Sequence, residues 1–138
     1  MLKDSERWGP QLELGDPQID KEHQQITGQL ERLRSLITGE ATIETLIGSL
    51  APLFEQLTAH FVAEESLFET QGYPEVGQHK KEHQEYLDQA RMTLESLNQN
   101  DLGSFQSQLV QLSDRWLQEH ILVEDKLAIS FINAQESP

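Results

Sequence analysis

The stretch LFEQLTAHFVAEESL, residues 53–67, decides the fold of this chain. A spacing of four and three residues runs through it, at Leu53, Leu57, His60, Glu64 and Leu67. That spacing is typical of one face of an α-helix, and it predicts a helix that turns this face toward a core. His60 and Glu64 are four residues apart, so they point in nearly the same direction on a helix. A histidine and a glutamate at core positions need a partner or a ligand.

The same spacing recurs in three other segments of the chain, and glycine, proline or asparagine residues separate the segments. We therefore predict an all-α fold, an up-down-up-down antiparallel four-helix bundle with an N-terminal arm over residues 1–17. One domain is expected to cover residues 1–138. The helices are predicted at roughly residues 18–37, 41–70, 75–98 and 102–132.

Three local features refine this prediction. Pro52 should kink the second helix or split it, because proline cannot donate the backbone hydrogen bond of a helix interior. Val123 and Leu127 continue the apolar spacing of the fourth helix, so they are expected in the core. The polar tail from about Asn133 should fray.

Composition limits the classes of partner. The chain has 138 residues, no cysteine and a formal net charge of −14 at neutral pH. Phosphate groups repel such a surface, which disfavours nucleic acid and anionic membranes, and the lack of cysteine excludes disulfides and thiolate metal sites. No signal peptide and no apolar run of about 18 residues is visible. We expect a cytoplasmic monomer that binds neither nucleic acid nor membranes.

All five histidines fall on core positions of the predicted helices, with at least one in each helix. Because neighbouring helices run in opposite directions, these positions place all five at the same end of the bundle. One buried histidine is usually a core residue with satisfied hydrogen bonds, but five at one level have few partners apart from Glu64. The pattern favours a metal site. The five are His23, His60, His79, His83 and His120.

Five imidazoles exceed what one tetrahedral ion takes, so we infer two metal ions bridged by carboxylates. Glu64 supplies one carboxylate, and the other should come from the fourth helix. There, Glu124 follows His120 by four residues and Asp125 follows it by five. On a regular helix Asp125 points about 140° away from His120, unless a π-bulge or unwinding intervenes. Spacing alone leaves both candidates open.

Four motifs together resemble the hemerythrin domain in its bacterial single-domain form. They are WGPQLELGDPQIDKEH (8–23), HFVAEE (60–65), YPEVGQHKKEH (73–83) and WLQEHILVED (116–125). The likeness runs from Trp8 to about Phe131, and the combined histidine pattern is highly specific. It implies a four-helix bundle with a non-haem di-iron centre. The implied function is reversible O2 binding, for oxygen transport, storage or sensing, and not catalysis.

The resemblance also implies a ligand set for two iron ions (Fe2+/Fe3+), bridged by carboxylates and an oxo or hydroxo group. The implied ligands are His79, His83 and His120 on one iron, His23 and His60 on the other, which keeps an open position, and the bridging Glu64 and Asp125. Asp125 is thus favoured over Glu124, with a distortion of the helix after His120.

The resemblance also implies a pocket with apolar walls around the bound O2. Leu117 matches the position that lines the oxygen pocket in the family, and Trp116 and Trp8 match aromatic positions that pack around the site. Ile26 is a further candidate for the wall, as are Phe61 and Leu57. A wall of this kind would keep water and protons out. A site rich in histidine favours reversible binding, whereas di-iron oxidases use four carboxylates.

Several alternatives stay open. HKKEH (79–83) also fits an inverted zinc-protease motif with Glu82 as the base, but that motif leaves three histidines unexplained. A di-iron enzyme on the same scaffold could act as a peroxidase, a nitric oxide reductase or an iron-handling protein. A sensing module that controls a partner is a third possibility, and a metal-free bundle is the fourth.

Overall fold

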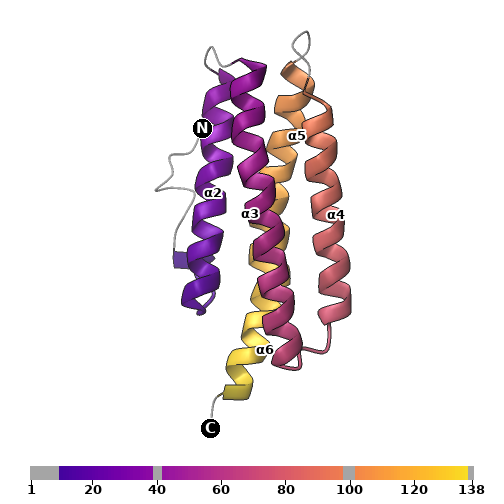
Figure 1. Cartoon of the computed structure of the whole chain (residues 1–138). Coiled ribbons are helices and arrows are strands. Elements are labelled where there is room, and N and C mark those ends of the chain that lie inside the picture. The colour runs from indigo at the N-terminus through magenta and orange to yellow at the C-terminus, as the bar shows by residue number, and fades with distance from the viewer. Residues whose placement is uncertain (1–9, 39–41, 98–101, 137–138) are drawn as a thin grey trace.

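Helices make up the bundle that the sequence predicts. The structure, a computed structural model, describes residues 10–38, 42–97 and 102–136. In chain order, the helices are the short 3-10 helix η1 (Pro10–Leu12), α2 (Pro17–Thr38), α3 (Ile43–Thr70), α4 (Val76–Glu95), α5 (Leu102–Arg115), the π-helix η2 (Trp116–Asp125) and α6 (Lys126–Glu136). The described residues contain no strand. Helices α5, η2 and α6 follow one another as a single fourth rod (Figure 1).

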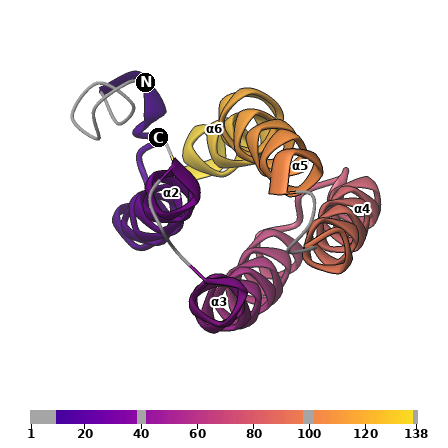
Figure 2. The same ribbon diagram turned by 90° about the horizontal axis from the view of Figure 1, so that it is seen from above.

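The four rods stand at the corners of a square when seen along the bundle axis (Figure 2). Each rod packs against its two neighbours, with α2 beside α3 and α5, and α4 beside α3 and α5. Successive rods run in opposite directions, so the start of α2, the end of α3, the start of α4 and the end of the fourth rod share one end (Figure 1). The all-α antiparallel bundle is therefore confirmed.

Hydrogen bonds from backbone N–H groups to a polar side chain cap the N-termini of α2 and α3. Asp16 accepts hydrogen bonds from the backbone N–H groups of Gln18 and Ile19, both at 3.1 Å. Thr42 accepts one from the N–H of Thr45 at 3.2 Å. Each bond satisfies a donor that has no partner inside its helix. Pro52 lies within α3, which is one uninterrupted helix, so the proline does not split it.

Apolar side chains form two separate groups along the bundle. The larger, here called the main core, includes Leu30, Leu57 and Leu109. The smaller, here called the end core, lies at the shared end of the rods. The end core consists of Ile19, Phe68, Ala128, Ile129 and Ile132.

The structure corrects two expectations about the fourth rod. Its last helix continues to Glu136 and does not fray from Asn133, because Ile129 and Ile132 anchor α6 in the end core. Val123 and Leu127 do not lie in the core, since they are 51% and 61% exposed. A π-helix places more residues in each turn than an α-helix, so η2 shifts the inward positions away from the regular spacing. None of the described helices is long and apolar enough to cross a membrane.

Candidate metal centre

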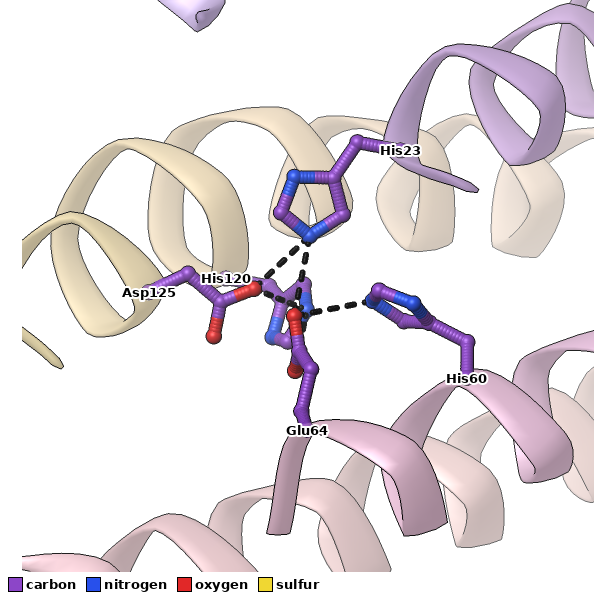
Figure 3. Close-up of side chains that lie close together, drawn as sticks. All are labelled: His23, His60, Glu64, His120 and Asp125. Carbon is purple, nitrogen blue, oxygen red and sulfur yellow. Dashed lines mark hydrogen bonds and ion pairs between the residues drawn. The ribbon is translucent and has the colours of Figure 1, made fainter. Parts of the chain in front are cut away.

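All seven predicted ligands lie together in one layer between the main core and the end core. They are buried, with no side chain more than 3% exposed, and they come from every rod of the bundle. Their ligand atoms form two overlapping groups, and within each group all atoms lie within 4.8 Å of one another. One group is His23, His60, Glu64, His120 and Asp125, and the other is Glu64, His79, His83, His120 and Asp125. We call these seven residues the polar layer, and Figure 3 shows the first group.

Glu64 lies between the two groups and faces a different set of imidazoles with each oxygen. Its Oε2 lies 3.0 Å from the Nε2 of His23 and 2.9 Å from the Nε2 of His60. Its Oε1 faces the Nε2 atoms of His83 at 3.1 Å, His120 at 3.5 Å and His79 at 3.8 Å. The carboxylate therefore divides the five rings into a set of two and a set of three.

Asp125 is the second shared carboxylate. Its Oδ1 lies 2.7 Å from the Nε2 of His79, and its Oδ2 lies 2.7 Å from His23 and 2.9 Å from His120. Here His120 shares an oxygen with His23, whereas at Glu64 it belongs with the set of three. Geometry alone therefore places His120 between the two groups.

The π-helix explains how Asp125 reaches the layer. The backbone N–H of Lys126 donates to the carbonyl of Ile121, five residues earlier, which is the hydrogen bond of a π-helix. Asp125 consequently faces the same interior as His120, although they are five residues apart. Glu124 points to the outer side of that ring, where its Oε1 lies 3.6 Å from Nδ1 of His120. The structure thus brings Asp125, and not Glu124, into the polar layer.

Carboxylates behind the layer orient two of the imidazoles. Nδ1 of His60 donates to Oε1 of Glu22 at 2.6 Å, and Nδ1 of His83 donates to Oε2 of Glu65 at 2.8 Å. A ring whose Nδ1 carries the proton presents the lone pair of Nε2 to the interior. Metal-binding histidines commonly have such an outer acceptor. Sequence reasoning did not identify these glutamates, because each partner lies on another helix, at no fixed spacing.

The charges of the layer are balanced by protons on the rings. Burial lowers the pKa of His79, but its hydrogen bonds to Asp125 and Glu64 outweigh burial and raise the pKa to about 9. The same balance raises the pKa values of His23 and His120. Burial raises the pKa of Glu64, but the nearby His60 and His120 hold it well below its usual value. The layer therefore contains ionised carboxylates that require positive charge beside them.

Several polar atoms of the layer fit a metal site. The Nε2 atoms of His60, His83 and His120, Oε1 of Glu64 and Oδ2 of Asp125 are buried, and none makes a well-directed hydrogen bond, although each faces another ligand atom of the layer at 3.1 Å or less. A buried polar atom without a partner costs about 1–3 kcal/mol. Five such atoms on side chains that converge on the same points fit a cluster of metal ligands. Imidazole and carboxylate together suit iron and zinc.

Aromatic and apolar residues surround the layer. The ring of Trp116 stacks on His120 with centroids 4.6 Å apart, and its Nε1–H donates to Oγ1 of Thr27 at 3.0 Å. Phe61 stacks on His83 with centroids 4.0 Å apart. Ile26 is fully buried, whereas Leu117 is half-buried against the main core. Trp8 lies outside the described residues.

Comparisons with known proteins agree with this arrangement. The chain matches the model of the Hemerythrin HHE cation binding domain over residues 14–132. It is 27% identical to a Bacteriohemerythrin of Clostridium acetobutylicum over 126 residues, which cover 86% of this chain and 95% of the relative. It is 28% identical to a Bacteriohemerythrin of Stenotrophomonas maltophilia over 122 residues, covering 86% of this chain and 76% of the relative. No solved structure matches the chain. The chain belongs to the hemerythrin family.

Proposed function

We propose that the polar layer holds two iron ions and that the chain binds dioxygen reversibly, as a carrier, a store or a sensor of oxygen. His79, His83 and His120 would bind one iron, His23 and His60 the other, and Glu64 and Asp125 would bridge them. The observation that carries this proposal is the division of the five rings by the two oxygens of Glu64. The names of the two relatives support it.

The donor set suits reversible binding. Two ferrous ions held by these residues would supply the electrons that dioxygen takes up on binding and returns on release. The layer offers two carboxylates beside five imidazoles, whereas the di-iron carboxylate proteins use four carboxylates and two histidines. Less negative charge stabilises high-valent iron less, which disfavours cleavage of the O–O bond.

The residues around the layer have separate tasks in this proposal. Glu22 and Glu65 hold the outer protons of His60 and His83, so that both rings keep Nε2 directed inward. Trp116, Ile26 and Leu117 would form the apolar wall that excludes water and protons from the bound gas. We also propose that the chain acts as a monomer without nucleic-acid or anionic-membrane partners, on the basis of its net charge of −14.

Metal analysis combined with visible spectra tests the proposal. We expect two irons per chain, and an absorption band that develops when the reduced protein meets oxygen and disappears when oxygen is removed. His83→Ala should lose iron together with stability, because metal binding couples to folding. Gln84→Ala, an exposed neighbour on α4, is the matched control and should keep both irons. Failure of the wild-type chain to bind two irons would refute the proposal.

The same measurements separate a carrier from an enzyme. A di-iron oxidase would consume oxygen repeatedly in the presence of a reductant and would cycle through the diferric state. A carrier would take up about one dioxygen per iron pair and hold it. Sustained oxygen consumption would therefore favour an oxidase over the function proposed here, whereas turnover of added hydrogen peroxide or nitric oxide would favour a peroxidase or a nitric oxide reductase.

A further inference from the structure

A cavity of about 200 Å³ opens between α4 and the fourth rod, directly beside the polar layer. His79 forms part of its wall, and on the inner side Nε2 of the same ring lies 2.7 Å from Oδ1 of Asp125. One imidazole therefore joins the wall of a surface cavity to the interior of the layer.

The cavity is acidic. Glu75, Glu82 and Glu124 line it, and its lining residues include neither lysine nor arginine. A basic surface would be attracted to this cavity.

The rim of the cavity is apolar. Val123 and Leu127, one turn apart on the fourth rod, are the exposed residues described above, and the half-buried Tyr73 lies opposite them. The π-helix turns both aliphatic side chains outward, so neither contributes to a core. Apolar and charged side chains side by side are typical of a protein–protein interface.

We propose that this surface, formed by Glu75, Glu82, Glu124, Val123 and Leu127, docks a redox protein that presents a basic patch around a small apolar contact, and that His79 conducts electrons from it to the centre. The inference rests on the proposed di-iron function. Each encounter oxidises the partner by one electron and reduces the centre by one, with no bond made or broken. Two encounters return a diferric centre to the diferrous state that binds oxygen.

An alternative use of the same cavity is the uptake of ferrous ions. The carboxylates would suit a hydrated cation. The exposed apolar rim does not strengthen the binding of a hydrated ion. A protein partner would bury the rim, and this burial stabilises the complex. The rim therefore favours the protein, and the ion becomes an outcome of the test.

The test uses zinc-substituted cytochrome c, a basic protein whose photoexcited state is a strong one-electron donor. Calorimetry measures its affinity for the iron-loaded chain, and decay of the excited state measures electron transfer to the diferric form. The variants are Glu75→Lys for the charge and Leu127→Gln for the rim. Their matched controls on α3 are Glu55→Lys and Ile47→Gln, which change exposed residues of another rod. A parallel assay follows the uptake of Fe2+ by the iron-free chain.

We expect Glu75→Lys to reduce affinity and the electron-transfer rate on the order of tenfold at low ionic strength, with the effect shrinking as salt is added. Leu127→Gln should reduce both several-fold, and the controls should stay close to wild type. Equal effects in the variants and their controls would overturn the proposal, as would slower Fe2+ uptake with unchanged affinity for the cytochrome. If the wild-type chain binds no iron, the proposed function fails instead, and calorimetry on the iron-free chain still decides the docking surface.

Discussion

The main core and the polar layer occupy the same four rods but have opposite chemistry. The main core is apolar, and residues such as Leu57 and Leu109 stabilise it by burial alone. The polar layer buries two ionised carboxylates and five imidazoles, and burial of charge opposes folding unless opposite charge lies beside it. The comparison shows that burial of apolar side chains is enough to stabilise the main core. The polar layer, in contrast, is stable only when protons or metal ions balance the charge of its carboxylates.

Removing the shared charge of the layer should have the largest effect. In Glu64→Gln, all five rings lose a carboxylate oxygen that faces them, so we expect the iron content to fall from two per chain to below one. The main core is untouched, and the iron-free variant should stay helical by circular dichroism. Glu55→Gln, an exposed change on the same helix, should keep both irons. If the Glu64→Gln chain were unfolded, the stability of the main core would depend on the polar layer, and the comparison would fail.

A cavity in the main core should destabilise the protein with or without iron. Leu109 is fully buried, so Leu109→Ala should lower the free energy of unfolding by about 2–5 kcal/mol. Chemical denaturation of the iron-free and iron-loaded forms should give the same difference. Ile47→Ala, at an exposed position, should change it little. If iron abolished the effect at Leu109, the comparison between the regions would fail.

The carboxylates behind the layer should have a smaller effect on iron. Glu22→Gln and Glu65→Gln each weaken an outer hydrogen bond of one imidazole, so we expect affinity for iron to fall about 10–100-fold. Competition with a chelator measures this. Glu85→Gln, on the exposed surface of α4, serves as the control. If both variants bound iron as tightly as the wild type, packing alone would be enough to orient the imidazoles of His60 and His83.

A dependence on pH that only the iron-free protein shows is a further expected effect. The pKa of His79 is raised from 6.5 to about 9 in the folded chain, so protonation stabilises the fold. That contribution is fully present below pH 6.5 and is lost as the pH rises through about 9. Denaturation of the iron-free chain across this range should therefore show falling stability. The iron-loaded chain should not, because the metal replaces these protons.

The regular parts of the molecule could be predicted from the sequence. The helical spacing gave four rods and most buried positions, because burial of an apolar face determines which side of a helix points inward. It also placed the five histidines in one layer. Spacing alone could not choose between Glu124 and Asp125, since that choice depends on a local departure from the α-helix. The resemblance to the family favoured Asp125.

One error came from the same departure, and the other misses came from contacts between distant parts of the chain. Val123 and Leu127 fit the regular spacing but are exposed, because the period changes within η2. Glu22 and Glu65 carry no signal in the sequence, since their partners lie on other helices and only the packing of the bundle brings them together. The length of α6 depends on contacts with Ile19 and Phe68, which lie far away in the chain.

The extra residue in the turn after His120 also sets the rotational phase of everything that follows it. Each residue of an α-helix adds about 100° of rotation, so if this segment became a regular α-helix at the same length, Asp125 and all of α6 would swing by about that angle. Ile129 and Ile132 would then turn away from Ile19 and Phe68. The ligand geometry and the closure of the bundle end are therefore set by one and the same insertion, and neither can change without the other.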